Sequence, residues 1–289
     1  MKFLVAGGTG QLGSDFSRIA SSKGYEVISL SSSDLDITDM DNVHAAVMQY
    51  TPDIVLNAAA YTAVDKAEAE SELAFRINRD GAANLARVCS RLNIPLIHIS
   101  TDYVFDGEQA RPYTEGDSAN PTGVYGKSKY EGELAVREYC DNHIILRVAW
   151  VFGVYGNNFV KTIQRLARER ETLKVVADQQ GCPTSTRAIS MALLQIVTNL
   201  DKNWGTYHYV CQPATSWHGF AEAVVAETSR HESLAIKEVL PITTEEYPTP
   251  ATRPKSSVLD YTKIKQVFGV EPADWRAELR DVIDELAEP

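Results

Sequence analysis

A glycine-rich loop close to the amino terminus constrains the fold of this chain more than any other feature of its sequence. It reads Gly7-Gly8-Thr9-Gly10-Gln11-Leu12-Gly13 and follows an apolar run from Lys2 to Ala6 that predicts a buried strand. Apolar residues recur at helical spacing from Phe16 to Ala20, so the loop joins a strand to a helix. Glycines in that place permit a tight turn and let backbone N–H groups approach a pyrophosphate at the helix amino terminus. The sequence therefore predicts a dinucleotide-binding loop that includes Gly7, Gly10 and Gly13.

The strand–helix alternation continues through the first half of the chain. Apolar runs predict strands at 27–30, 53–57, 95–100 and 144–148, and helical patterns lie between them near 43–47, 73–88 and 128–139. This rhythm indicates an α/β fold, a Rossmann-type doubly wound parallel sheet with right-handed crossovers. After residue 150 six prolines lie between 183 and 254, which favours a smaller mixed α/β substrate-binding lobe. We expect a dinucleotide-binding domain over 1–150 and mainly a substrate-binding lobe over 151–289, with a return to the sheet left open.

Charge and hydropathy exclude several classes of function. The 289 residues contain 28 Lys and Arg against 39 Asp and Glu, a net charge of −11, which argues against nucleic-acid partners and a basic membrane surface. The apolar runs are far shorter than the roughly 18 residues of a membrane span. Glycine interrupts the amino-terminal run too early for a signal peptide. We expect a cytoplasmic protein without a membrane partner.

Cysteine and histidine patterns predict no metal centre. Four cysteines lie far apart without a C-x-x-C pair, so reduced thiols are expected. Six histidines form neither H-x-x-x-H nor H-E-x-x-H, which argues against zinc.

The three-plus-three spacing of the glycines resembles the extended form of the short-chain dehydrogenase/reductase superfamily. That resemblance implies a Tyr-x-x-x-Lys pair, and two are present, Tyr125/Lys129 and Tyr261/Lys265. The first pair opens a predicted helix after a segment, 100–105, that leaves the carboxyl end of a strand, where such sheets bind ligands. The second has no such partner segment, so we interpret it as structural.

Residues four apart share one face of a helix, so Lys129 can lie beside the phenol of Tyr125. A nearby ammonium is expected to lower the tyrosine pKa from about 10 toward working pH, as suits a general acid in carbonyl reduction. The superfamily resemblance implies that Lys129 also holds the nicotinamide ribose and that Thr101 helps to bind the substrate carbonyl. The alternative is a surface Tyr–Lys pair and a strand-end threonine.

The tripeptide Thr101-Asp102-Tyr103 narrows the set of reactions that the chain could catalyse. Sugar-nucleotide 4,6-dehydratases of this superfamily carry Thr-Asp-Glu, because eliminating water needs an additional carboxylate. The glutamate is missing here, so dehydration is disfavoured, whereas a 4-epimerase stays open.

Four longer segments closely resemble the dTDP-4-dehydrorhamnose reductase family, over nearly the whole chain: 57–65 (NAAAYTAVD), 100–107 (STDYVFDG), 156–159 (GNNF) and 247–254 (YPTPATRP). The resemblance implies reduction of the 4-keto group of dTDP-4-dehydro-L-rhamnose to dTDP-L-rhamnose. It implies Tyr125 as proton donor, assisted by Lys129 and Thr101. It places around the cofactor Gly10, Gln11, Leu12, Asp36, Ile37, Ala60, Tyr61 and Thr62, and around the substrate Thr101, Asp102 and Trp150. For Trp150 the alternative is core packing at a strand end.

The preference for NADH or NADPH depends on which side chain follows the second predicted strand. A NAD-specific site usually places Asp or Glu there, but Leu30 is followed by three serines, beginning with Ser31, and Asp34 comes later. Arg18 on the first helix could help to neutralise a 2′-phosphate. We expect Ser31 to contact the cofactor, and NADPH to be used at least as well as NADH.

Three further expectations concern charged residues and partners. Arg253 is expected either to meet the substrate pyrophosphate in a bidentate contact or to form a salt bridge within its lobe. The family resemblance raises a magnesium-bridged dimer in which Asp15 would take part, but Arg187 stands where a carboxylate would be needed, which argues against bridging Mg²⁺. A homodimer stays open.

Two other functions compete with the reductase. One is a different nucleotide-sugar 4-ketoreductase or epimerase, and the other is a non-catalytic regulatory subunit with the same fold. The complete set of Thr101, Tyr125 and Lys129 weighs against the regulatory subunit.

Overall fold

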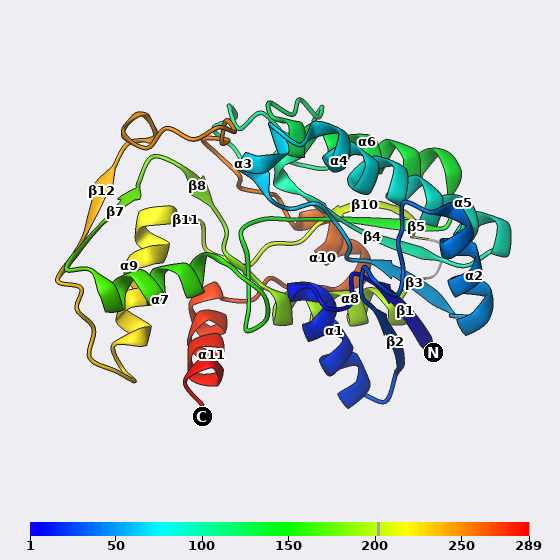
Figure 1. Ribbon diagram of the computed structural model, residues 1–289, viewed down its shortest axis with the longest axis horizontal. Helices are drawn as coiled ribbons and strands as arrows, with labels where there is room; N and C mark the ends of the chain where they lie inside the picture. Colours follow the sequence, from blue (N-terminus) through cyan, green and yellow to red (C-terminus); the bar gives the residue numbers. More distant parts are fainter. Residues whose placement is uncertain (201–202, 289) are drawn as a thin grey trace.

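A parallel sheet of six strands forms the larger of two lobes in the computed structural model, which describes residues 1–200 and 203–288 (Figure 1). The strand order is β2-β1-β3-β4-β5-β10. Winding therefore reverses between β1 and β3, and the loops after those two strands open to the crevice where such sheets bind ligands. The strands are β1 (Lys2–Ala6), β2 (Glu26–Leu30), β3 (Ile54–Asn57), β4 (Leu96–Thr101), β5 (His143–Val148) and β10 (Gly205–His208).

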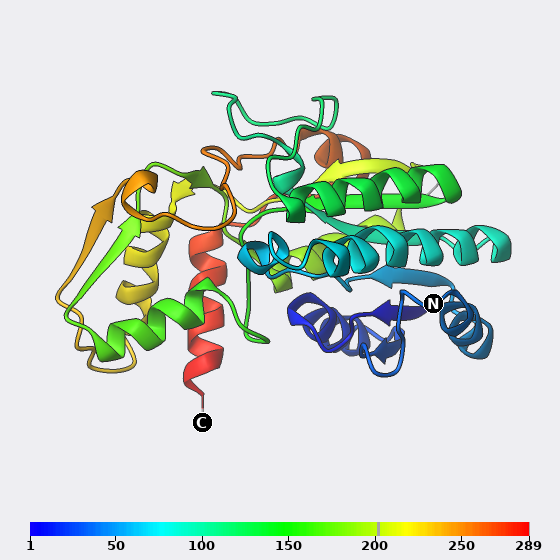
Figure 2. The same cartoon turned by 45° about the horizontal axis from the view of Figure 1, so that its top comes forward.

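Helices cover both faces of this sheet (Figure 2). One face packs against α1 (Gln11–Ser22) and α8 (Thr186–Thr198), and the other against α2 (Met40–Tyr50), α5 (Ala82–Leu92) and α6 (Val124–Tyr139). Successive side chains of a strand alternate between the two cores: Phe3 joins the first and Leu4 the second, both fully buried. The predicted doubly wound α/β fold is confirmed, and its strands and helices fall close to the expected ranges.

The helix expected over 73–88 is not regular. It consists of α4 (Ser71–Phe75), a π-helical turn (Arg76–Gly81) and then α5. The wider turn brings the Asn78 backbone against α6, where an added Cβ on Gly132 would lie 2.2 Å from the Asn78 carbonyl oxygen. Glycine at 132 therefore permits this close approach of the two helices.

The smaller lobe contains three helices around a parallel strand pair. The helices are α7 (Phe159–Glu169), α9 (Trp217–Thr228) and α11 (Trp275–Ala287), and the strands are β7 (Thr172–Val176) and β12 (Glu238–Ile242). Short strands complete the connections: β6 (Val151–Phe152) with β9 (Thr184–Ser185), and β8 (Gln180–Gly181) with β11 (Thr215–Ser216).

The two lobes share one hydrophobic core. It extends from Phe3 of β1 to Trp275 of α11, and both side chains are fully buried. After residue 150 the chain re-enters the larger lobe through α8 and β10, which pairs with β5, and α10 (Thr262–Phe268) packs on β10. The return to the sheet that the sequence left open thus takes place. Within 1–200 and 203–288 no helix is long and apolar enough to cross a membrane.

Candidate active site

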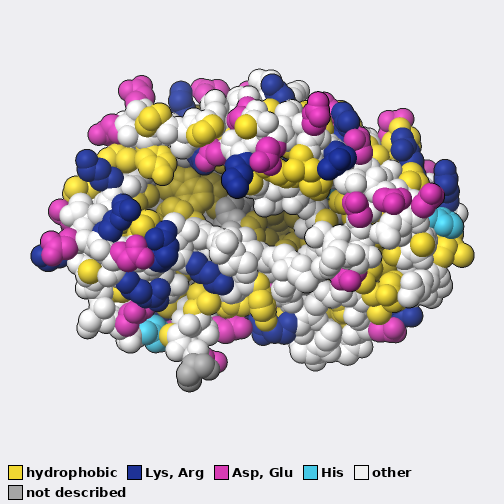
Figure 3. Space-filling view, in the orientation of Figure 1, with side chains coloured by type: hydrophobic (Ala, Val, Ile, Leu, Met, Phe, Trp, Pro, Cys, Tyr) yellow, Lys and Arg dark blue, Asp and Glu magenta, His cyan; other side chains and the backbone are white. Residues whose placement is uncertain are grey.

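A cleft of about 910 Å³ lies between the two lobes. Its walls come from the β1–α1 loop, the carboxyl ends of β4 and β5, α6, α7, β7 and the segment 247–253. Figure 3 shows this face hollowed, with hydrophobic side chains inside the hollow. The volume is at the upper end of the range of roughly 300–1,000 Å³ that is usual for small-molecule sites. The cleft is therefore large enough for two ligands to meet.

The glycine loop and the start of α1 line one part of the cleft, through Gly10, Gln11 and Leu12. Gly7 has φ +77°, and a Cβ on it would lie 2.6 Å from the Ala59 nitrogen. A Cβ on Gly13 would lie 2.2 Å from the Gly7 carbonyl oxygen, so only glycine lets α1 approach the strand so closely. Helix α1 starts after Gly10 without a side-chain cap, which leaves its first N–H groups to a ligand. These features fit a pyrophosphate.

The loop after β3 forms the neighbouring wall, and Asn57 fixes it. The Asn57 carboxamide oxygen accepts a hydrogen bond of 3.1 Å from the Ala59 nitrogen, and its Nδ2 lies 3.0 Å from His98 Nδ1. Of the expected cofactor residues here, Ala60 and Thr62 line the cleft. The Tyr61 phenol instead donates to Glu70 at 2.6 Å, and this hydrogen bond raises the pKa of Tyr61 to about 12. The Tyr61 backbone exchanges two hydrogen bonds with the Asn78 carboxamide, at 2.8 and 3.1 Å, so Tyr61 fixes the loop from outside the cleft.

Ser31, Asp36 and Ile37 lie beyond the cleft, past the end of β2. Ile37 is buried under α5, and Asp36 accepts hydrogen bonds from the backbone and hydroxyl of Thr38. Ser31 donates to Asp34 from its backbone nitrogen at 3.1 Å and from its hydroxyl at 2.5 Å, and this lowers the pKa of Asp34. A carboxylate therefore lies at the end of β2 with hydrogen-bond partners of its own.

The structure corrects the role considered for Arg18. Its guanidinium pairs with Asp15 at 2.8 Å and approaches Glu285 at 3.8 Å, so it is already neutralised. Asp15 is buried, and its other oxygen accepts a 2.6 Å hydrogen bond from Thr186. Both oxygens of Asp15 are thus used inside the chain. The described residues contain no cluster of three metal-ligating side chains.

Thr101, Tyr125 and Lys129 meet in the cleft. Thr101 ends β4, and Tyr125 lies in the first turn of α6. A Cβ on Gly126 would lie 2.2 Å from the Tyr103 carbonyl oxygen, so this glycine lets the start of α6 pack against the segment after β4. The Lys129 ammonium donates to the Ile99 carbonyl oxygen at 2.7 Å. The expected acid, its lysine and the threonine therefore share one wall.

The expected lowering of the tyrosine pKa is wrong for the protein without ligands. Burial raises the pKa of Tyr125 to about 12, although hydrogen bonding with Thr101 opposes the rise. Burial also lowers the pKa of Lys129 to about 8, against the attraction of Glu133. Loss of hydration disfavours the charged form of each group, and the negative charge of Asp102 adds to the rise at Tyr125. Tyr125 is therefore a protonated phenol at neutral pH, which is the form that a general acid needs.

Asp102 presents an unsatisfied oxygen in the same cleft. It is 3% exposed, its Oδ1 accepts a 2.9 Å hydrogen bond from Thr101, and its Oδ2 is buried with no hydrogen-bond partner. Burial raises the pKa of Asp102 to about 6. A buried carboxylate oxygen without a partner is unfavourable, and a ligand that donates a hydrogen bond to it would remove this cost.

Tyr103 occupies the place of the glutamate found in dehydratases. Its ring meets that of Tyr125 edge to face, with centroids 5.4 Å apart, and it lines the cleft. Burial raises the pKa of Tyr103. An aromatic wall thus replaces the additional carboxylate that elimination would need.

A buried ion cluster behind this wall was not expected from the sequence. Glu133, one turn after Lys129, is completely buried and receives hydrogen bonds from Ser100 at 2.6 Å and from Arg147 at 2.8 and 2.7 Å. Arg137 adds a contact of 2.7 Å. The cluster joins α6 to β4 and β5, and the paired charges hold the pKa of Glu133 below its ordinary value despite burial.

Trp150 and Arg253 both line the cleft, and each has a partner that the sequence did not indicate. Trp150 stacks on Trp217 with ring centroids 3.5 Å apart. Arg253 forms a salt bridge to Asp65 at 2.9 Å. Neither partner carries a local signal, since both contacts join residues more than 60 positions apart.

Comparison with known proteins finds similar sequences and structures over nearly the whole chain. The family model for the RmlD substrate binding domain matches residues 1–288. The dTDP-4-dehydrorhamnose reductase of Aggregatibacter actinomycetemcomitans is 44% identical over 97% of this chain and 98% of its own. The dTDP-4-dehydrorhamnose reductase structure from Clostridium acetobutylicum has a TM-score of 0.94 at 41% identity and covers 100% of both chains. The Bacillus anthracis enzyme of that name, solved in complex with NADP, has a TM-score of 0.92 at 35% identity, over 98% of this chain and 99% of its own.

Proposed function

Because the chain belongs to the RmlD substrate binding domain family, we propose that its interlobe cleft is the active site and that Tyr125 is the proton donor. The chain is a nicotinamide-dependent oxidoreductase, and its reaction is reduction of the 4-keto group of dTDP-4-dehydro-L-rhamnose to dTDP-L-rhamnose. The observation that carries the site assignment is the meeting of Thr101, Tyr125 and Lys129 in the cleft that the glycine loop lines.

The nicotinamide cofactor, when bound, supplies the hydride for the carbonyl carbon. Tyr125 lies beside Thr101 and gives its phenolic proton to the carbonyl oxygen, so the ketone becomes a secondary alcohol. The Thr101 hydroxyl would turn from Asp102 Oδ1 to donate to the carbonyl oxygen and hold it near the phenol. Lys129, charged at neutral pH, stabilises the phenolate that remains until it takes a proton from solvent. Position 103 is a tyrosine where dehydratases have a glutamate. The reaction therefore does not eliminate one of the sugar's other hydroxyl groups as water.

We place the cofactor along the larger lobe. Its pyrophosphate would be held at the start of α1 by Gly7, Gly10, Gln11, Leu12 and Gly13. The part of the cofactor that leads from there toward Lys129 would be flanked by Ala60, Tyr61 and Thr62. Ser31, Asp36 and Ile37 would surround the adenosine end beyond β2. Backbone N–H groups would then bind the negatively charged pyrophosphate of the cofactor. This suits a chain whose own net charge is negative.

We also propose that NADPH serves at least as well as NADH. The Bacillus anthracis relative was solved in complex with NADP, and Ser31 holds the carboxylate at the end of β2 through two hydrogen bonds to Oδ2 of Asp34. The ratio of kcat/KM for the two cofactors tests this proposal. A preference for NADH of about tenfold or more, which is 1.4 kcal/mol, would contradict it.

The substrate extends from Thr101 across the smaller lobe. Asp102 and Trp150 flank the sugar, and Arg253 lies where it can meet the diphosphate. The thymidine diphosphate would supply binding energy that positions the carbonyl within about 3–3.5 Å of the hydride donor. The enzyme should therefore reduce the nucleotide sugar and be nearly inactive on the free ketosugar.

A steady-state assay of NADPH oxidation tests the proposal. It compares dTDP-4-dehydro-L-rhamnose with the free ketosugar, and the product is identified by NMR. Equal turnover of both sugars would contradict a site built around the nucleotide.

A further inference from the structure

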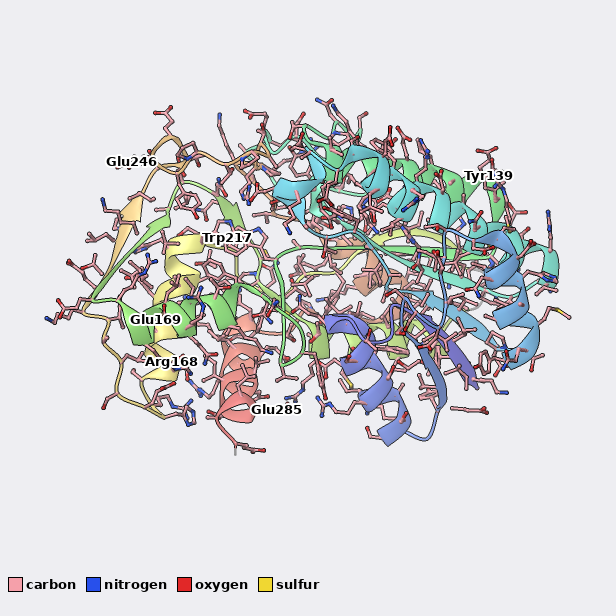
Figure 4. The ribbon with its side chains drawn as sticks, in the orientation of Figure 1. Tyr139, Arg168, Glu169, Trp217, Glu246 and Glu285 are labelled. Carbon is pink, nitrogen blue, oxygen red and sulfur yellow. The ribbon has the colours of Figure 1, made fainter. Side chains whose placement is uncertain are left out.

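Two indole rings lie face to face on the cleft wall. The centroids of Trp150 and Trp217 are 3.5 Å apart and their planes are inclined by 9°. Trp217 is the first residue of α9 in the smaller lobe, as labelled in Figure 4, whereas Trp150 follows β5 of the larger lobe. Both side chains line the cleft. The stack therefore connects the two lobes at the place where the sugar would lie.

The backbone of Trp150 is in an unfavourable conformation. Its φ is +47°, in the left-handed region that large side chains rarely adopt and that persists only where the surrounding structure fixes it. The Trp150 carbonyl oxygen accepts a 3.1 Å hydrogen bond from the Thr184 nitrogen. A Cβ on Gly181 would lie 2.3 Å from the Trp150 ring, so glycine makes room for the indole. These contacts hold the backbone and crowd the ring at Cε2, Cζ2 and Nε1, and Trp217 covers a face of the ring.

Trp217 is itself anchored from behind. Its ring centroid lies 4.6 Å from that of Phe159, which in turn stacks on the fully buried Phe220 at 5.4 Å. Trp217 thus has two aromatic neighbours, Trp150 and Phe159. It also lines the cleft, and the contact with Phe159 holds its ring where it can fix the Trp150 indole.

We propose that Trp217 is a positioning residue for the substrate: it holds the Trp150 indole in the orientation in which that ring contacts the sugar. The inference rests on the proposed function and on the place of Trp150 in it. Removing Trp217 leaves the Trp150 ring free to rotate into the space that the stack had filled. The carbonyl would then be held less well against Thr101 and Tyr125, while the cofactor loop is untouched.

A double-mutant cycle on the full-length protein tests this inference. Trp217→Ala should lower kcat/KM for the nucleotide sugar roughly 10- to 100-fold, since small misplacements in an active site have effects of this size. NADPH affinity should stay unchanged, and Trp217→Phe should restore most of the loss. In the Trp150→Ala background, Trp217→Ala should cause no further loss, because its effect runs through Trp150.

Circular dichroism supplies a readout that does not depend on turnover. Stacked indoles couple their electronic transitions, so either Trp→Ala substitution should abolish the same exciton couplet, whereas Trp204→Phe outside the cleft should preserve it. If Trp217→Ala proves too unstable, Trp217→Leu keeps an apolar side chain in part of the space and removes the stack.

Several results would overturn the inference. Additive losses in the cycle would show that Trp217 acts independently of Trp150. An unchanged kcat/KM in a Trp217 variant that has lost the couplet, with only a lower Tm, would leave Trp217 a purely structural role. Failure of the proposed function is a different result, because wild-type protein itself would then oxidise no NADPH with the nucleotide sugar, and the inference would fall with it.

Discussion

Arg253 and Asp65 form a two-point ion pair between the segment 247–254 and the short helix α3 (Val64–Ala67). The two nitrogen–oxygen distances are both 2.9 Å. The Arg253 guanidinium nevertheless lines the cleft, where the substrate diphosphate would compete with Asp65 for it.

Arg253→Ala should therefore lower kcat/KM for the nucleotide sugar roughly 10- to 100-fold, because a hydrogen bond to a charged group contributes about 1.5–3 kcal/mol. Asp65→Asn keeps the shape but removes the competing charge, so KM should fall by up to about fivefold, the size of a partly exposed ion pair. Steady-state kinetics of both variants measure the two effects. If Asp65→Asn raised KM as much as Arg253→Ala does, the ion pair would serve only to anchor the segment 247–254. Arg253 would then have no contact with the diphosphate.

The rate should depend on pH through two buried groups of the free enzyme. The pKa of Asp102 is raised to about 6 and that of Lys129 is lowered to about 8. We expect kcat/KM to fall below pH 6, where Asp102 gains a proton and no longer accepts from the sugar, and above pH 8, where Lys129 loses its charge. The acid limb should be absent in Asp102→Asn. An acid limb that stays unchanged in this variant would assign it to another group.

The same carboxyl group makes a prediction about stability. Its folded-state pKa of about 6 exceeds the ordinary value of 3.8, so the folded protein binds this proton more tightly than the unfolded chain does. Folding is therefore penalised above pH 6, on the order of 3 kcal/mol at pH 7, and the penalty disappears as the pH falls toward 4. Relative to wild type, Asp102→Asn should have a higher Tm at pH 7 and lose that advantage at pH 4. Equal Tm differences at both pH values would contradict the raised pKa.

The buried Glu133 cluster should matter far more to stability than exposed pairs do. Glu133→Ala leaves Arg147 buried without its carboxylate partner and should destabilise the protein by about 3–5 kcal/mol. The matched control is Glu169→Ala, which breaks an exposed i,i+4 pair with Arg165 and should change stability by less than about 1 kcal/mol. Figure 4 labels Glu169 on the outer side of α7. Denaturant unfolding measures both, and equal losses would refute the argument from burial.

The sequence predicted the elements of this fold because their signals are local. The strand β1, the glycine loop and the first turn of α6 with Tyr125 are each specified by residues within a few positions of one another. That locality also placed Thr101 and Tyr125 at the same edge of the sheet, since parallel strands end at one edge.

The remaining features depend on contacts between distant segments. The Trp150–Trp217 stack and the Asp65–Arg253 pair join different lobes, and no periodicity within either segment indicates them. The π-helical turn that contains Asn78 packs closely against Gly132, which lies 54 positions further along the chain. The pKa of Tyr125 is raised by burial. Burial depends on how several elements pack together, so the local sequence does not indicate it.

The central claim is that Tyr125 gives the proton to the substrate carbonyl. The most direct test is kcat of Tyr125→Phe with dTDP-4-dehydro-L-rhamnose, alongside the Kd for NADPH. The account predicts a fall in kcat of roughly 10²–10⁴-fold with a nearly unchanged Kd, because the substitution removes one hydroxyl and its proton. A kcat close to that of the wild type would contradict it.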